Sequence, residues 1–204
     1  MKKPDIVFDV DGVLLYYMTA FAEYMEVRHG IKCHVRLPCP VFHSMKNLFP
    51  GIDVRDYIVK MSVDPIFATM KSMDGAVDGL KKIADHFDIH AVSAAGNDIT
   101  REYRIKNLQD VFGWKDEWPV HIVPLGARKT QHLSEFAPGT IFIDDSYEHV
   151  ADARELGLNG IWFKGGVEHY LCDEHEKQAR DRMKIIHGWS ELLKEVSRIS
   201  KISF

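Results

Sequence analysis

Cysteine is scarce in this sequence. Only Cys33, Cys39 and Cys172 occur among the 204 residues. An odd and small number of cysteines argues against a disulfide framework. Because disulfides are rare in reducing compartments, the composition predicts a reduced, intracellular protein with a cytoplasmic location.

Long apolar runs are also missing. No stretch reaches the roughly 18 uninterrupted apolar residues of a membrane-spanning helix. Acidic residues interrupt the first apolar run in MKKPDIVFDVDG, which is not the pattern of a signal peptide. The formal charge is only −4, which gives no general attraction to nucleic acid or to an anionic membrane surface. We therefore expect neither a membrane nor a nucleic acid as a partner.

What the sequence does contain is an alternation of short apolar segments with helical patterns. The apolar segments are bounded mostly by Gly, Pro or Asp, and several are rich in Val and Ile, which predicts strands. They cover residues 4–10, 87–94, 120–125, 139–145 and 159–164, and the helical patterns cover 76–86, 98–112, about 129–136 and 147–157. Asn97 or Asp98 is the expected N-cap of the helix at 98–112, and Gly113 its stop. The predicted fold class is α/β, a doubly wound parallel sheet with a Rossmann-like core.

Residues 16–73 break this alternation. The segment YYMTAFAEYMEVRHG predicts an amphipathic helix that ends at Gly30, and a second short helix is expected over 53–61. About sixty residues are too many for a simple loop in a compact domain. We predict a small helical cap at 16–73, inserted after the first strand into a core domain formed by 1–15 and 74–204.

The last segment, MKIIHGWSELLKEVSRISKISF, carries apolar residues from Ile185 to Ile199 at helical spacing. We expect this helix to pack against the sheet domain, and a homodimer contact is the alternative.

Polar side chains follow several of the predicted strands at the point where each strand ends. They are Asp9 and Asp11 after the first strand, Ser93 at the end of the second, Lys129 shortly after the third, and Asp144 and Asp145 at the end of the fourth. Ligands of doubly wound sheets bind outside the carboxyl ends of the strands. Four separate segments thus deliver these groups to one edge of the sheet.

The chemistry open to this set is narrow. Residues i and i+2 leaving a strand point to the same side, so Asp9 and Asp11 can act on one group, one as nucleophile and the other moving a proton. Carboxylates brought together repel one another unless a cation lies among them, and oxygen ligands suit Mg²⁺. Lys129 and Ser93 offer donors for anionic oxygens. The composite is a Mg²⁺-assisted phosphoryl-transfer site with a covalent aspartyl phosphate.

Four stretches resemble the four motifs of the haloacid dehalogenase-like (HAD) phosphatases. They are DVDGVL (9–14), HAVSAAGND (90–98), ARKTQHL (127–133) and IFIDDS (141–146), and their order and spacing fit. The resemblance implies that Asp9 is the nucleophile and Asp11 the general acid and base. It implies that Ser93, Ala94 and Lys129 hold the phosphoryl group. Mg²⁺ would be bound by Asp9, the Asp11 backbone carbonyl and Asp145.

The fourth motif departs from this family. Many relatives place a second acid four residues after the metal-binding Asp, and His149 stands at that position here. Asp144 beside Asp145 is the alternative, as in relatives with a double Asp, so either residue remains a candidate metal ligand.

The substrate should be selected by the cap, which holds Tyr16, Tyr17, Phe21, Tyr24, Phe42, Phe49 and Phe67. Such aromatic rings stack on a base or simply pack the cap. The short early cap, the double Asp and GWSELLKEV are similar to the 5'(3')-deoxyribonucleotidases, which implies a (deoxy)nucleoside 5'-monophosphate as the small-molecule phosphate ester. The alternatives are a phosphatase on sugar phosphates or nucleic-acid ends, a phosphotransferase, and a non-catalytic binding protein. Dehalogenation fits less well, because dehalogenating relatives lack the role that Asp11 would fill.

Other polar groups have plainer interpretations. Cys33, His34, Cys39 and His43 lie within eleven residues but match none of the common zinc spacings. His169, Cys172, Asp173 and His175 form a second loose cluster. Arg101, Arg104 and Lys106 are expected on the solvent face of their helix, and Trp114 and Trp118 are expected to pack near its end.

Overall fold

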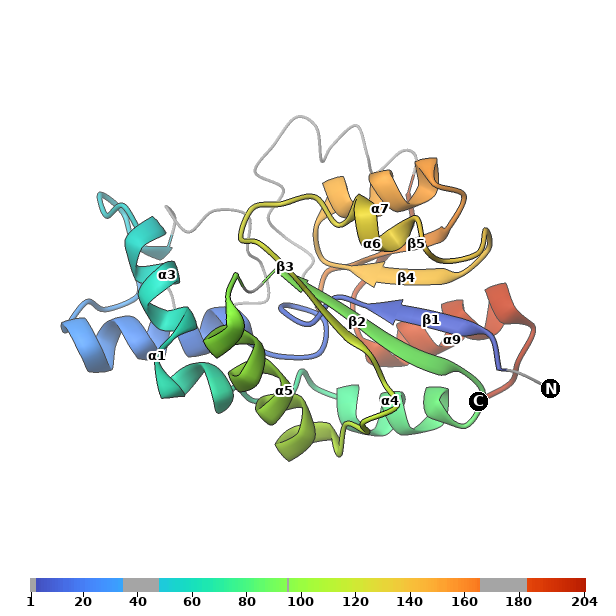
Figure 1. Cartoon of the computed structure of the whole chain (residues 1–204), viewed down its shortest axis with the longest axis horizontal. Helices are drawn as coiled ribbons and strands as arrows, with labels where there is room; N and C mark the ends of the chain where they lie inside the picture. The colour runs from blue at the N-terminus through green and yellow to red at the C-terminus, as the bar shows by residue number, and fades with distance from the viewer. Residues whose placement is uncertain (1–2, 35–47, 95, 166–182) are drawn as a thin grey trace.

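The computed structural model describes residues 3–34, 48–94, 96–165 and 183–204 (Figure 1). Its centre is a six-stranded sheet in the order β3-β2-β1-β4-β5-β6, and every neighbouring pair is parallel. The strands are β1 (Asp5–Phe8), β2 (Asp88–Ala94), β3 (Val120–Val123), β4 (Ile141–Asp144), β5 (Asn159–Phe163) and β6 (Ile185–Ile186). The predicted α/β class with a parallel sheet is confirmed.

Helices cover both faces of this sheet. One face carries α4 (Ala76–Ala84), α5 (Asp98–Phe112) and α9 (Trp189–Ser200), and the other carries α6 (Thr130–Leu133) and α7 (Tyr147–Glu155) (Figure 1). Alternate side chains of a strand point to opposite faces. In β1, Ile6 and Phe8 accordingly join the apolar cluster under α4 and α9, whereas Val7 joins the cluster under α6 and α7.

The helix α5 shows why sequence signals at helix ends are reliable. The Asn97 side chain accepts a hydrogen bond from the Thr100 backbone N–H at 3.0 Å, and Gly113 adopts φ = 63°. Asn97, rather than Asp98, is therefore the N-cap, and glycine ends the helix in the left-handed conformation that it adopts without strain. Trp114 and Trp118 pack edge to face just beyond, as predicted.

The last segment was predicted as helical from Ile185 onward, and this is wrong for its start. Ile185 and Ile186 form β6, which pairs with Trp162 and Phe163 at the edge of the sheet. Two residues are too few to show a strand period, so the apolar pair was absorbed into the helical pattern. The helix α9 begins at Trp189, and its apolar face, including Leu192 and Val196, is buried within the chain.

Between β1 and α4 the described chain is helical. It holds α1 (Tyr17–His29), which ends at Gly30 as expected, α3 (Arg55–Ser62) and the short 3₁₀ helix η1 (Pro65–Ala68), which the sequence did not predict. These elements lie beyond the carboxyl ends of the strands (Figure 1). Several aromatic rings of this part of the chain are packing residues: Phe21, Tyr24, Phe49 and Phe67 are all buried. Phe42 lies outside the described residues.

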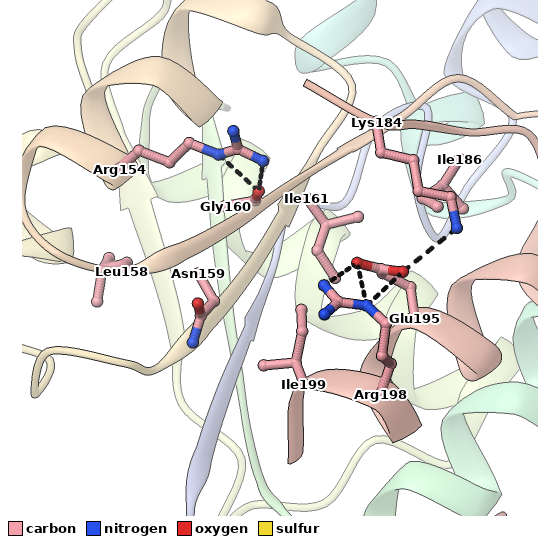
Figure 2. Close-up of a pocket in the computed structure, with 10 residues that line it drawn as sticks. All are labelled: Arg154, Leu158, Asn159, Gly160, Ile161, Lys184, Ile186, Glu195, Arg198 and Ile199. Carbon is pink, nitrogen blue, oxygen red and sulfur yellow. Dashed lines mark hydrogen bonds and ion pairs between the residues drawn. The ribbon is translucent and has the colours of Figure 1, made fainter. Parts of the chain in front are cut away.

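None of the described helices is long and apolar enough to cross a membrane. A cavity of about 270 Å³ lies beside the first half of β5, away from the carboxyl ends of the strands (Figure 2). Arg154 donates to the Gly160 carbonyl there, and Glu195 pairs with Arg198 and Lys184. These charged side chains thus have partners within the wall of the cavity.

Candidate active site

The loop after β1 brings Asp9 to the end of β4. The Asp9 backbone N–H donates to the Ile143 carbonyl at 2.8 Å, which continues the pairing of the two strands. Gly12 follows with φ = 77°, and a Cβ placed on it would lie 2.3 Å from Oδ2 of Asp145. Glycine is therefore required here for two reasons, the backbone conformation and the close approach to a carboxylate.

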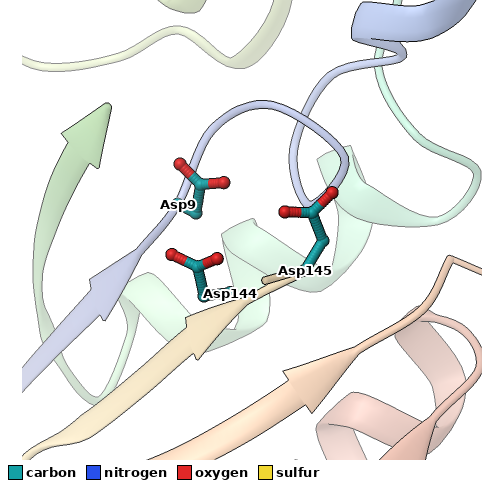
Figure 3. A group of neighbouring side chains, drawn as sticks. All are labelled: Asp9, Asp144 and Asp145. Carbon is teal, nitrogen blue, oxygen red and sulfur yellow. The ribbon is translucent and has the colours of Figure 1, made fainter. Parts of the chain in front are cut away.

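Three carboxylates meet at this point. Asp9, Asp144 and Asp145 each offer an oxygen, and these three oxygens lie within 4.8 Å of one another (Figure 3). The sequence placed all three at this edge, and the structure brings them together. Clustered carboxylate oxygens are the ligand type that Mg²⁺ binds.

Lys129 lies inside this cluster rather than at its rim. Its side chain is only 2% exposed, and its Nζ lies 2.6 Å from Oδ1 of Asp9 and 2.7 Å from Oδ2 of Asp144. Burial lowers the pKa of the Lys129 ammonium, but the two carboxylates outweigh burial and the net pKa is raised. Lys129 is therefore a permanent positive charge beside Asp9.

The two neighbouring aspartates have different surroundings. Asp144 accepts from Lys129 and from the Ser146 backbone N–H at 2.8 Å, and His149 Nδ1 lies 3.3 Å from its Oδ2. Although burial acts to raise the pKa of Asp144, Lys129 and His149 bring the net pKa below its ordinary value. Asp145 instead lies against the Gly12 turn, and its backbone carbonyl accepts from Trp162 Nε1.

Burial raises the pKa values of the other two carboxyl groups, those of Asp9 and Asp145. It raises the pKa of Asp9 to about 7, against the opposing effect of Lys129 and with the help of Asp144 and Asp11. The pKa of Asp145 is also raised, first by burial and then by Asp9 and Asp144. Both carboxylates are costly to ionise in this pocket without a cation. The donor set thus fits a divalent metal ion, with Asp9 and Asp145 as the carboxylates that gain most from it.

Ser93 lies at the end of β2 and is fully buried. Its Oγ has no hydrogen-bond partner among the residues that the structure describes. An unpaired buried hydroxyl costs free energy, which a ligand oxygen can recover. Ala94, the last residue of β2, is half-buried beside it.

Asp11 has a partner that the sequence analysis did not identify. Its Oδ2 accepts from Nη2 of Arg104 at 2.6 Å, and the Arg104 side chain is 0% exposed. The prediction that Arg104 faces solvent is therefore wrong, although Arg101 and Lys106 on the same helix are exposed. Arg104 is buried because η1 covers this part of α5, and Phe67 of η1 lies under its guanidinium.

The histidine and cysteine clusters add no site to this picture. Cys33 and His34 are described, but Cys39 and His43 lie outside the described residues, as do His169, Cys172, Asp173 and His175. Within the described ranges, the three aspartates form the one group of acidic, His or Cys side chains close enough to share a metal ion.

No protein-family model matches the chain, and no curated protein matches its sequence. Solved structures do match along almost its whole length. A HAD family hydrolase from Deinococcus radiodurans, with bound phosphate and sodium, has a TM-score of 0.62 at 15% identity and covers 98% of each chain. A HAD hydrolase from Bacillus subtilis, bound to magnesium, has a TM-score of 0.60 at 17% identity and covers 99% of this chain and 100% of its own. An L-2-haloacid dehalogenase also has a TM-score of 0.60, at 13% identity, and covers 96% of this chain and 99% of its own. The protein therefore has the fold of the haloacid dehalogenase-like hydrolases.

Proposed function

We propose that the protein is a Mg²⁺-dependent phosphomonoester hydrolase that works through an aspartyl phosphate on Asp9. The observation that carries this proposal is the buried Lys129 ammonium between Asp9 and Asp144, with Asp145 at the same point. A nucleophilic carboxylate, a fixed cation and a second carboxylate for a metal are the parts that phosphoryl transfer needs.

In the first step, an Asp9 oxygen attacks phosphorus and the bond from phosphorus to the ester oxygen breaks. Asp11 gives its proton to the departing alkoxide. In the second step, Asp11 takes a proton from water, the water oxygen attacks phosphorus, and the bond from Asp9 to phosphorus breaks to release phosphate. Lys129 and the unpaired Ser93 hydroxyl donate to the phosphoryl oxygens, and Ala94 belongs to the same phosphate-binding segment. Asp9, Asp145 and the Asp11 backbone carbonyl would hold Mg²⁺, which supplies positive charge to the transferring group.

The substrate we propose is a small phosphorylated metabolite, with (deoxy)nucleoside 5'-monophosphates first. Residues 16–73, which include α1, α3 and η1, form the cap in this proposal, and 1–15 with 74–204 form the core. Because the carboxyl edge of the sheet handles only the phosphate, the cap selects the rest of the molecule. A sugar phosphate as substrate, or transfer of the phosphoryl group to a sugar hydroxyl in place of water, uses the same residues.

Dehalogenation is the second candidate, because one similar structure is an L-2-haloacid dehalogenase. A halide leaves without a proton, so that reaction has no use for a carboxyl held at Asp11. The intact Asp11, fixed by Arg104, favours the phosphatase.

The test is phosphate release from nucleoside monophosphates, sugar phosphates and 4-nitrophenyl phosphate, and halide release from 2-chloropropionate. Each is run with Mg²⁺ and with chelator, on the wild type, Asp9→Asn and Asp116→Asn, which removes an exposed carboxylate as a control. We expect Mg²⁺-dependent phosphate release that only Asp9→Asn abolishes. Halide release, or no phosphate release from a folded protein, would overturn the proposal.

A further inference from the structure

Arg104 is a fully buried arginine in the middle of α5. Its guanidinium is fully buried, with Nη2 on Asp11 at 2.6 Å and Nη1 3.8 Å from the Met70 sulfur. Its central carbon lies 4.3 Å from the Phe67 ring centroid. Its Nε has no hydrogen-bond partner among the described residues. One carboxylate and one aromatic face therefore provide most of its stabilisation.

Burying a guanidinium costs several kcal/mol, and good geometry to a counter-charge is needed to offset that cost. In the described part of the chain, Asp11 is the one carboxylate that pairs with Arg104. Asp11 depends on Arg104 in turn, because Arg104 holds one oxygen of Asp11 and thereby restricts the orientation of its carboxyl group.

The other oxygen of Asp11 is the important one. Oδ1 is buried and has no hydrogen-bond partner in the described residues. Asp11 is thus anchored through Oδ2 and keeps Oδ1 for another group. A carboxyl that must pass a proton to a leaving oxygen needs this arrangement, since misplacement by about 1 Å can cost on the order of 100-fold in rate.

Arg104 also connects Asp11 with the segment that we propose as the cap. Phe67 belongs to η1, and Asn107, one turn further along α5, donates to the Met70 carbonyl at 2.9 Å. Tyr17 of α1 lies near enough for the charges of Asp11 and Arg104 to act on its hydroxyl. The buried Arg104 side chain therefore contacts both Asp11 and the residues Phe67 and Met70 of this segment.

We propose that Arg104 is a positioning residue, which holds Asp11 so that Oδ1 meets the leaving-group oxygen, and which links that orientation to η1 through Phe67. This inference rests on the proposed phosphatase function. It concerns the orientation of Asp11.

The test compares two esters whose leaving groups depend to different degrees on protonation by a general acid. The 4-nitrophenolate group leaves readily without a proton, whereas an alkoxide does not. We would measure kcat/KM, which covers departure of the leaving group but not the later attack of water, for 4-nitrophenyl phosphate and for the best alkyl phosphate substrate. The variants are Arg104→Met, Arg104→Lys and Phe67→Leu, with Arg101→Met as the control on the exposed face of α5.

We expect Arg104→Met to lose on the order of 100-fold in kcat/KM with the alkyl ester and less than about 3-fold with the aryl ester. Arg104→Lys should recover part of the loss, and Phe67→Leu should show a smaller loss that is again confined to the alkyl ester. Retained aryl phosphate hydrolysis also shows that a variant is folded.

Equal losses with both esters would overturn the positioning role while leaving the phosphatase intact. If Arg104→Met does not fold, Phe67→Leu and Arg104→Lys decide between the same two results. An inactive wild type would instead overturn the proposed function, and the role of Arg104 with it.

Discussion

Removing the charge of Asp9 should stabilise the metal-free protein at neutral pH, although it abolishes the proposed activity. The pKa of Asp9 is raised from 3.8 to about 7, mainly by burial. The folded protein therefore holds this proton more tightly than the unfolded chain does, so stability falls as pH rises from 3.8 towards 7. A rise of that size corresponds to about 4 kcal/mol once Asp9 is fully ionised. That figure already includes the attraction of Lys129, and relaxation of the site around the ionised carboxylate lowers it, so we expect a net gain of about 2 kcal/mol.

The assay is thermal unfolding in chelator across the range from pH 4 to pH 8. For a chain of this length, about 2 kcal/mol corresponds to a Tm higher by about 4–8 °C at pH 8, and the difference should vanish near pH 4. Asp116→Asn should shift Tm at neither pH. Added Mg²⁺ should raise the Tm of the wild type and leave Asp9→Asn almost unchanged. A variant that is less stable than the wild type at pH 8, or a gain that persists at pH 4, would refute the account of a strained, buried carboxylate.

Three further predictions concern single side chains. Gly12→Ala places a Cβ 2.3 Å from a carboxylate oxygen of Asp145, so Mg²⁺ affinity measured by calorimetry should fall at least about tenfold. The control is Gly51→Ala, which has a similar φ of 79° but open space around it, and it should leave the Mg²⁺ affinity unchanged. Gly79→Ala would normally favour a helix by about 1 kcal/mol, but its Cβ would lie 2.3 Å from the indole of Trp189 packed on α4. We therefore expect urea unfolding to give a free energy of unfolding lower by about 1–3 kcal/mol, with a lower midpoint, and a higher midpoint would contradict the packing. Hydrogen bonds from Arg198, against the opposing effect of burial, hold the pKa of Glu195 below its ordinary 4.5. Glu195→Gln should therefore lower the free energy of unfolding by less than about 1 kcal/mol above pH 4.5, and this loss should shrink as the pH falls below 4.5 through the pKa of the folded protein. A loss that is unchanged at pH 3 would contradict this reasoning.

The acidic edge of the sheet was predictable because its residues sit at strand ends. Asp9, Lys129 and the Asp144–Asp145 pair each follow an apolar, β-branched segment, and the parallel arrangement places such ends together. The sequence left open which of the two aspartates is the candidate metal ligand. The structure distinguishes them by the Lys129 and His149 contacts of Asp144, which belong to tertiary structure.

Arg104 could not be predicted in the same way. In α5 it lies one turn from the exposed Arg101, and a helix with charges at this spacing ordinarily presents them to solvent. The groups that bury it come from elsewhere in the chain: Met70 is 34 positions away and Asp11 is 93 positions away. Local periodicity carries no information about such neighbours, and η1, which supplies Phe67, is too short to have a period of its own.

The central place of β1 has a consequence for the synthesis of this protein. β1 leaves the ribosome before the other described strands of the sheet, yet its two partners are β2, more than eighty residues later, and β4, where Ile6 meets Ile141. Until both have emerged, an apolar strand that carries Asp9 at its end has two unpaired edges, which is the exposure that favours aggregation. Contacts so distant in sequence also slow folding, because the intervening chain must be closed first. A nascent chain that has not yet released residue 145 therefore contains Asp9 and Lys129 but not the complete cluster of three aspartates, and we expect occupancy by chaperones to be greatest during that interval.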